Sequence, residues 1–208
     1  MRSTYKCVGL VLRFRQLGSK LMAKKIISSE HNQIDQRELR NALGRFATGI
    51  TVVTTTTDDG VNEALTANSF AALSLDPPLV LWSLTIESPS RVGFLSAGRF
   101  AINVLGAHQR SISNQFAQSA QDKFDGIAWH HGRIGCPILD DHLAVFECST
   151  ERAIESGDHL LFIGRVEGLS YREGAALVYS AGKYCMAAEL PDDNTTGETT
   201  FTDILRWS

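Results

Sequence analysis

The chain has 208 residues, of which 43% are hydrophobic and 21% are charged, and its net charge at pH 7 is −3. This composition is typical of a globular domain with a sizeable core and is too apolar for a disordered chain. An acidic net charge gives no electrostatic support for a nucleic-acid partner, so we expect none.

The first 29 residues differ from the rest, because they contain seven basic residues and no acidic one. Removing these seven charges from the total of −3 leaves −10 for residues 30–208. The apolar run at residues 7–12 is too short for a signal peptide and too short to span a membrane. We therefore expect residues 1–29 to be a basic, disordered leader on a cytoplasmic protein with no membrane partner. Met22, followed by Ala23-Lys24-Lys25, resembles a natural beginning, so we favour an upstream start codon. An amphipathic transit peptide fits the acid-poor composition but is only a weak match.

Apolar periodicity predicts a helix over residues 35–47. Asp35, with Glu38 three residues later, resembles a capping box, and Gly49 is expected to stop the helix. Four apolar residues follow the i, i+3, i+4, i+7 spacing of one helical face, namely Leu39, Ala42, Leu43 and Phe46.

From Ile50 the residues are almost wholly β-branched, which favours a strand over 50–57. Asp58-Asp59-Gly60 is a hairpin signal, and a second strand follows toward Phe70. After a break at Asp76-Pro77-Pro78, the predicted elements are a strand at 79–84, a helix at about 89–97, a strand at 100–105, a helix near 108–119, and strands at 143–154, 160–171 and 176–180 running on to 184–187.

The glycine-rich stretch 122–141 is predicted to be a long surface loop, and residues 191–208 a polar, mobile tail. Many strands with few short helices predict a β-rich α+β fold, a closed antiparallel β-barrel with helices at its ends. A single domain over residues 30–190 holds all of these elements.

A short span of polar residues suggests a ligand site. Residues 66–70 are a hydroxyl- and amide-rich strand end, and residues 79–82 form an apolar strand. Ser88 is a good N-cap and Pro89 suits the first helical position, so free N–H groups with the hydroxyls of Ser88 and Ser90 would offer an anion site. This arrangement suits a planar heterocycle that carries a phosphate. However, most Ser-Pro-Ser caps only start helices, and the polar run could equally be a strand end turning into a loop.

No residue pattern predicts a metal site. The four cysteines lack the short spacing of zinc sites and redox dithiols, and without a secretion signal we expect reduced thiols. The adjacent His130 and His131 would point to opposite faces of an extended segment. Cys148, Trp82 and Trp129 are expected to be packing residues.

Six short segments occur in a fixed order: residues 43–55, 66–70, 73–81, 100–105, the Gly-Asp-His at 157–159 and the Gly-Lys-Tyr at 182–184. Each segment alone is a weak indication of a protein family. The ordered set, which covers residues 35–188, resembles the flavin reductase components of two-component flavin monooxygenases.

The resemblance implies an FMN-binding split β-barrel of Greek-key type, usually a homodimer. It implies an enzyme that transfers a hydride from NADH or NADPH to FMN or FAD. The reduced flavin then leaves for a separate flavin-dependent monooxygenase, often one that acts on an aromatic or phenolic substrate.

The resemblance also assigns candidate site residues. His159 would contact the nicotinamide as the catalytic candidate, with Asp158 beside it. Ser88 and Ser90 would hold the flavin phosphate, although the stretch 85–90 lacks the basic residue that many relatives carry. The other flavin-binding candidates are Ala64, Thr66, Asn68 and Ser69 along the isoalloxazine and ribityl groups, Ser83 and Leu84 near the ribityl–phosphate region, and Asn103 and Tyr184 as lesser candidates.

Two other hypotheses remain open from the sequence. One is a non-enzymatic FMN-binding or electron-carrier protein on the same barrel, but such a carrier would not need the nicotinamide contact of His159. The other is an interaction module that binds no flavin, which would leave the polar strand end and the Ser88–Ser90 cap unexplained.

Overall fold

The structure is a computed structural model that describes residues 26, 34–119 and 122–188. The predicted tail lies outside the described residues, and so does the predicted leader apart from Ile26. The chain divides into two compact units, Met1–Leu39 and Arg40–Ser208. In the first unit the described residues are Ile26 and those from 34 to 39, where the Glu38 backbone N–H donates to Asp35 Oδ1 at 2.9 Å and confirms the predicted cap.

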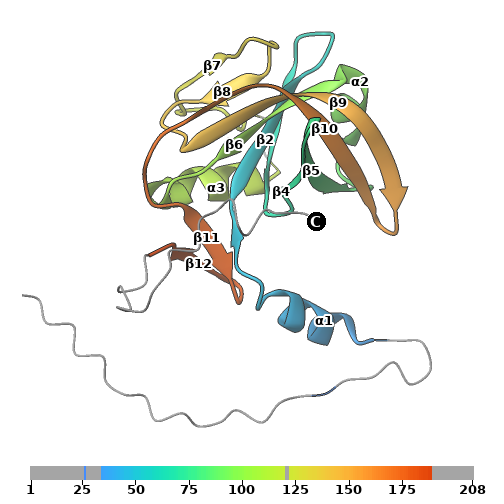
Figure 1. Cartoon of the computed structure of the whole chain (residues 1–208), viewed down its shortest axis with the longest axis vertical. Coiled ribbons are helices and arrows are strands. Elements are labelled where there is room, and N and C mark those ends of the chain that lie inside the picture. The colour runs from blue at the N-terminus through green and yellow to red at the C-terminus, as the bar shows by residue number, and fades with distance from the viewer. Residues whose placement is uncertain (1–25, 27–33, 120–121, 189–208) are drawn as a thin grey trace, which may run out of the picture. The chain divides into compact units, whose positions relative to one another are not determined.

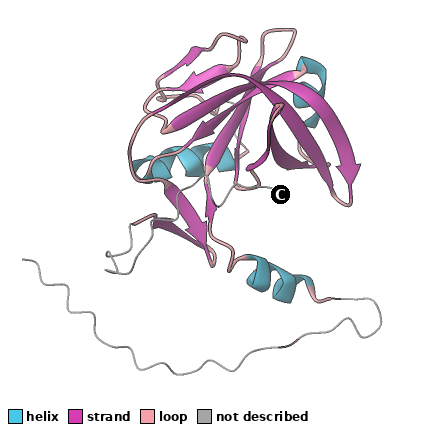
Figure 2. Cartoon of the chain, viewed as in Figure 1, coloured by secondary structure: helices cyan, strands magenta, loops and turns pink. Residues whose placement is uncertain are grey.

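Strands make up most of the secondary structure, and the helices are short (Figure 2). In chain order the elements are α1 (Gln36–Leu43), β1 (Thr48–Gly49), β2 (Thr51–Thr56), β3 (Asn62–Ala67), β4 (Ala71–Leu75), β5 (Pro78–Thr85), α2 (Arg91–Ala97), β6 (Arg99–Val104), the 3-10 helix η2 (Ala107–Gln109), α3 (Arg110–Ala117), β7 (Trp129–His131), β8 (Pro137–Leu139), β9 (Ala144–Ser156), β10 (His159–Tyr171), β11 (Leu177–Ser180) and β12 (Lys183–Met186).

The main sheet has seven antiparallel strands in the order β3-β2-β6-β9-β10-β5-β4 (Figure 1). The long hairpin of β9 and β10 turns at Gly157, whose φ of 62° is a conformation that glycine adopts at little cost. The edge strands β3 and β4 share no ladder within the described residues. The β-rich character with few helices is therefore confirmed, whereas the closed barrel stays a prediction.

The sheet has an apolar core on each face. Val52 and Val53 are neighbours on β2 and point to opposite faces, and both are fully buried. The Val53 face packs against Phe94 of α2, and Trp82 stacks on Phe162 there with ring centroids 4.7 Å apart. The Val52 face packs against Phe116 of α3. The two helices thus cover opposite faces of the sheet, and the predicted packing role of Trp82 is confirmed.

Three helix or loop predictions differ from the structure. Helix α1 ends at Leu43 rather than at residue 47, because Gly44 closes its last turn and the chain then bends, which leaves Phe46 77% exposed. Helix α2 begins after Ser90, two residues later than predicted. The stretch 122–141 is not a structureless loop, since it contains the hairpin of β7 and β8. Among the described residues, no helix combines the length and apolarity needed to cross a bilayer.

Candidate functional site

The two polar segments predicted to bind a ligand are joined directly. The Ser69 hydroxyl accepts a hydrogen bond from the Ser83 backbone N–H at 2.9 Å and donates to the Ser83 carbonyl oxygen at 3.1 Å. Ser69 lies in the link between β3 and β4, two residues before Ala71, and Ala71 pairs with Leu81 of β5, two residues before Ser83. This contact continues the pairing of β4 with β5 by one further step, through a side chain, and holds the link between β3 and β4 against β5.

The nicotinamide candidate lies on the same part of β5. His159 pairs with Thr85 in the ladder between β10 and β5, and the Ile86 backbone N–H donates to the Asp158 carbonyl oxygen at 3.0 Å. Ser83 and Thr85 are two residues apart and share the face of β5 that points away from the buried Trp82 and Leu84. Two residues of strand span about 7 Å, so one ligand could contact Ser83 and His159 together.

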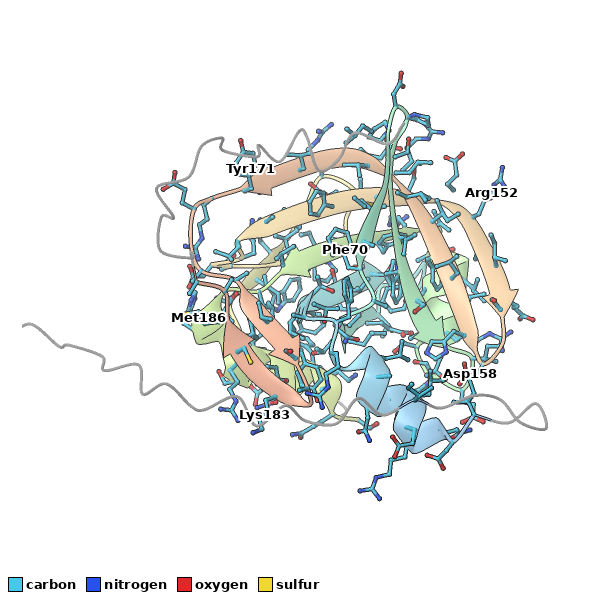
Figure 3. All side chains as sticks on the ribbon, turned by 60° about the horizontal axis from the view of Figure 1, so that its bottom comes forward. Phe70, Arg152, Asp158, Tyr171, Lys183 and Met186 are labelled. Atoms are coloured by element: carbon cyan, nitrogen blue, oxygen red, sulfur yellow. The ribbon has the colours of Figure 1, made fainter. Side chains whose placement is uncertain are left out.

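His159 is held by its neighbour. Its Nδ1 lies 2.7 Å from Asp158 Oδ1, at the exposed turn between β9 and β10, where Figure 3 labels Asp158. This hydrogen bond lowers the pKa of the Asp158 carboxyl, with a smaller backbone contribution. The His159 side chain is 46% exposed, so the ring is oriented and also open to a ligand.

Ser88 and Ser90 do not form the predicted helix cap. Ser90 is the N-cap of α2, its side chain makes no capping hydrogen bond, and the Ser88 hydroxyl accepts from the Ser90 backbone N–H at 3.3 Å. The prediction that Pro89 starts the helix is wrong, because Ser88 to Ser90 form a turn before it. The free N–H groups that would favour an anion therefore begin later than the sequence indicated.

Ser90 and Ala64 line one cavity of about 790 Å³, which we call the acid-lined cavity. Its charged lining consists of three carboxylates and one ammonium group, and its remaining walls include Phe124 and Trp129. The charged residues are Glu63, Asp122, Asp125 and Lys123. Like charges repel at short range, so this lining disfavours a phosphate next to Ser90.

Lys123 is a residue that the sequence did not single out. Its Nζ donates to the Ala64 carbonyl oxygen at 3.0 Å and to the Phe116 carbonyl oxygen at 3.4 Å. Burial lowers the pKa of Lys123, while the nearby Glu63 carboxylate acts in the opposite direction. Nothing in the local pattern marks this lysine, because the contacts that hold it come from β3 and α3.

Thr66, Asn68 and Tyr184 belong to a third group. The Thr66 hydroxyl donates to the Ser113 carbonyl oxygen at 2.7 Å, and the Ser113 hydroxyl lies 2.9 Å from the Tyr184 hydroxyl. The exposed Asn68 amide donates to Thr48 Oγ1 at 3.3 Å. These contacts tie β3, α3 and β12 together beside a second cavity of about 560 Å³, which Tyr184 lines.

Asn103, a lesser candidate for the flavin site, lies in the core of the structure. The residue is fully buried, its amide nitrogen donates to the Val52 carbonyl oxygen at 3.1 Å, and its Oδ1 accepts from the Leu139 backbone N–H at 2.9 Å. A buried amide must find partners inside the protein, and here those partners join β2, β6 and β8. The Leu84 side chain is also buried, so only its backbone is available to a ligand.

The structure thus brings Ser69, Ser83 and His159 together along β5 and β10, with Asp158 in the adjoining turn. Ala64 and Ser90 line one cavity, and Tyr184, to which Thr66 is linked through Ser113, lines another. Among residues 26, 34–119 and 122–188 no cluster of side chains could hold a metal ion. The arrangement offers hydroxyl and amide groups along a strand, together with one oriented imidazole.

Residues 43–188 match the family model described as "Flavin reductase like domain". The chain is 42% identical to the reductase component of a flavin-dependent trigonelline monooxygenase from Acinetobacter baylyi, over 76% of this chain and 51% of that protein. It is 43% identical to an FMN reductase (NADH), SmoA, from Agrobacterium fabrum, over 72% of this chain and 85% of that protein. The chain spans about half the length of some curated relatives that it matches.

A solved structure gives the same result for the fold. The NADH:FAD oxidoreductase SgcE6 of Streptomyces globisporus, in complex with NAD and FAD fragments, superposes with a TM-score of 0.72 at 31% identity. The match covers 82% of this chain and all of that chain.

Proposed function

Since this chain belongs to the flavin reductase like domain family, we propose that it is an NADH-dependent flavin reductase of the cytoplasm that reduces FMN or FAD. The names of its relatives support this activity, because they include an FMN reductase (NADH) and an NADH:FAD oxidoreductase. Cys136, Cys148 and Cys185 are free thiols, which suits a reducing compartment.

The observation that carries the proposal is the shared face of β5 and β10. The Ser69 hydroxyl, in the link between β3 and β4, bonds to the Ser83 backbone, and Thr85, on the same face of β5 as the Ser83 side chain, pairs with His159. A flavin laid along this face would meet the Asn68 and Ser69 segment, and a nicotinamide ring stacked on the flavin would meet His159. The groups present fit a flavin, since they are small, polar and uncharged.

When both nucleotides are bound, they supply the hydride donor and the hydride acceptor, and the protein supplies their relative position. The strand ends would orient the flavin through hydroxyl and backbone groups. His159, held by Asp158, would orient the nicotinamide through its free ring nitrogen. Ser88 and Ser90 would lie along the ribityl chain.

We also propose a partner and an assembly. The relative named as the reductase component of a monooxygenase supports delivery of reduced flavin to a separate monooxygenase, and by family resemblance its substrate is aromatic or phenolic. A homodimer built on the split barrel of the family is supported by β4, an edge strand with Leu75 71% exposed. Light scattering should give twice the chain mass, and Leu75→Lys should reduce it.

Steady-state kinetics test the activity. The purified full chain should oxidise NADH when FMN, FAD or riboflavin is added, and the rate should rise with flavin concentration and saturate. The absence of turnover with all three flavins, using both NADH and NADPH, would reject the proposal. A flavin-binding carrier without enzymatic activity would bind flavin and still show no turnover.

A further inference from the structure

The ammonium group of Lys123 makes its direct contacts with backbone. Lys123 lies in the segment between α3 and β7 and lines the acid-lined cavity, whose other charged groups are carboxylates. Its Nζ nevertheless donates to two carbonyl oxygens, that of Ala64 at 3.0 Å and that of Phe116 at 3.4 Å. Within the part of the chain that the structure describes, Lys123 forms no ion pair. The hydrogen bonds of this cation therefore join two pieces of backbone.

Both carbonyl groups lie at the margin of their element. Ala64 belongs to β3, an edge strand whose ladder within the described residues is with β2 alone. Phe116 lies in the last turn of α3, where the carbonyl groups of a helix lack an intrahelical partner. A lysine near the end of a helix can bond such carbonyl groups. Lys123 thus fastens the edge of the sheet to the end of a helix.

The backbone around Lys123 is held by the same helix. The side-chain amide of Gln115, on α3, donates to the Lys123 carbonyl oxygen at 3.1 Å and to the Asp125 carbonyl oxygen at 2.8 Å. The Phe124 ring packs edge-on against that of Phe116, with centroids 5.1 Å apart. The helix and the segment therefore hold each other, and the ammonium group is in place before any ligand binds.

The contacts of Lys123 bear on the strand end that is proposed to follow the flavin. Ala64 and Thr66 are two residues apart on β3 and share one face of the strand. The Thr66 hydroxyl donates to the Ser113 carbonyl oxygen of α3 at 2.7 Å, and Ala64 reaches α3 through Lys123. β3 is thus attached to α3 at two successive positions of this face, directly before Asn68 and Ser69. Loss of the Lys123 contact would leave one of the two.

We propose that Lys123 is a positioning residue for the flavin, because its ammonium group joins β3 to α3 and so fixes residues 66–69, through which it acts. Its hydrogen bonds are directed at carbonyl groups, and three carboxylates line the same cavity, so a direct contact with a phosphate is disfavoured. The proposal rests on the proposed function, since it concerns the same flavin.

Two variants of the full chain and one control test this role. Lys123→Met removes the charge and keeps an unbranched side chain, whereas Lys123→Arg keeps the charge. Arg133→Met is the control, because it removes one cation from the exposed turn between β7 and β8. Dissociation constants of riboflavin and FMN are measured by flavin fluorescence without NADH, and melting temperatures show whether each variant is folded.

Lys123→Met should raise the dissociation constants of riboflavin and FMN by the same factor, about three- to tenfold. The two factors should agree because riboflavin has the ring and the ribityl chain of FMN but no phosphate. Lys123→Arg should recover part of the loss, since a guanidinium group can also donate to two carbonyl groups. Arg133→Met should match the wild type.

The ionisation of Lys123 gives a second readout. Burial lowers the pKa of Lys123, while the Glu63 carboxylate of β3 acts in the opposite direction. The other charged groups that line the cavity are Asp122 and Asp125 of the same segment, and α3 contributes no charged group to this lining among the described residues. As the pH rises through the pKa of Lys123, the affinity of the wild type for riboflavin should fall relative to that of Lys123→Arg, whose side chain stays charged. The comparison at each pH cancels the ionisation of the flavin itself.

Three results would overturn the proposal. A larger loss for FMN than for riboflavin would show that the ammonium group binds the flavin phosphate directly. Unchanged riboflavin affinity in a folded Lys123→Met variant would show that the contact serves stability alone. If Lys123→Met does not fold, parallel pH profiles of the wild type and Lys123→Arg would have the same meaning. Failure of the proposed function has a different signature, namely no flavin-dependent NADH oxidation by the wild-type chain.

Discussion

The Ser69 hydroxyl makes two hydrogen bonds to the Ser83 backbone, because it donates to the Ser83 carbonyl oxygen and accepts from the Ser83 N–H. The contact joins the link between β3 and β4 to β5, two residues beyond the Ala71–Leu81 pair of the β4–β5 ladder. Both partners of the hydroxyl are backbone groups, so a ligand could replace neither bond without moving a strand.

Ser69→Ala should therefore weaken riboflavin and FMN by the same factor and lower the free energy of unfolding. The loss of two hydrogen bonds, one at each backbone group, should cost about 1–3 kcal/mol. Thermal melting and fluorescence titration measure the two effects. Ser96→Ala is the control, because the Ser96 hydroxyl donates to the Gly93 carbonyl oxygen within α2. A variant with normal stability and normal flavin binding would show that the contact does not shape the site.

His159→Ala should raise the Michaelis constant of NADH or lower the turnover number, and should leave flavin affinity nearly intact. The reason is that the imidazole lies at the β10 end of the face, opposite Thr85, away from the contact of Ser69 with Ser83. Asp158→Asn should have a smaller effect in the same direction, because it loosens the ring without removing it.

The chain offers a matched control for this pair. The Nδ1 atom of His130, on β7, lies 2.9 Å from Asp140 Oδ1, and the His130 side chain is exposed, as that of His159 is. His130→Ala should leave the kinetic constants unchanged. An equal kinetic effect of His130→Ala and His159→Ala would mean that the loss of His159 acts through stability rather than through the nicotinamide.

The double variant Ser88→Ala/Ser90→Ala should weaken riboflavin and FMN equally, by about two- to fivefold for exposed hydroxyl contacts. This expectation follows from the acid-lined cavity beside Ser90 and differs from the sequence prediction of a phosphate site. Flavin fluorescence titration gives both affinities. A loss of affinity for FMN alone would show that Ser88 and Ser90 bind the flavin phosphate, and would contradict the argument from the charges of the cavity.

Asn103→Ala should destabilise the protein and leave its Michaelis constants unchanged. The substitution leaves the Val52 carbonyl oxygen and the Leu139 backbone N–H without their buried partner. Unsatisfied buried groups cost about 1–3 kcal/mol each, so the free energy of unfolding should fall by at least about 2 kcal/mol. Urea denaturation measures it. An increase in the Michaelis constant of flavin at normal stability would show that Asn103 contributes to the flavin site.

The local sequence pattern was sufficient to predict the elements whose conformation depends on one physical preference. The β-branched run gives β2, the turn at Gly60 has the φ of 82° that favours glycine, and the apolar run from Leu160 gives β10. β7 and β8 are three residues each, too short for any periodicity to show. The end of α1 was missed because its apolar spacing continues to Phe46 although the helix stops at Leu43.

The site was predictable in its residue types and less so in its geometry. His159 and Ser69 could be named from motifs, but the contact of Ser69 with Ser83 depends on the meeting of two strands. Lys123 and Arg110 acquire their surroundings from distant elements, so no local signal marks them. Asn103 resembled a polar site residue in a strand, and only burial shows that its amide serves three strands of the core.

We propose above all that this chain passes reducing equivalents from NADH to free flavin. The most direct measurement is NADH oxidation by the purified full chain at 340 nm, with and without added FMN, FAD or riboflavin. We expect no NADH oxidation without flavin and saturable oxidation with it, faster with NADH than with NADPH. NADH oxidation that is independent of added flavin, or no oxidation with any flavin, would contradict it.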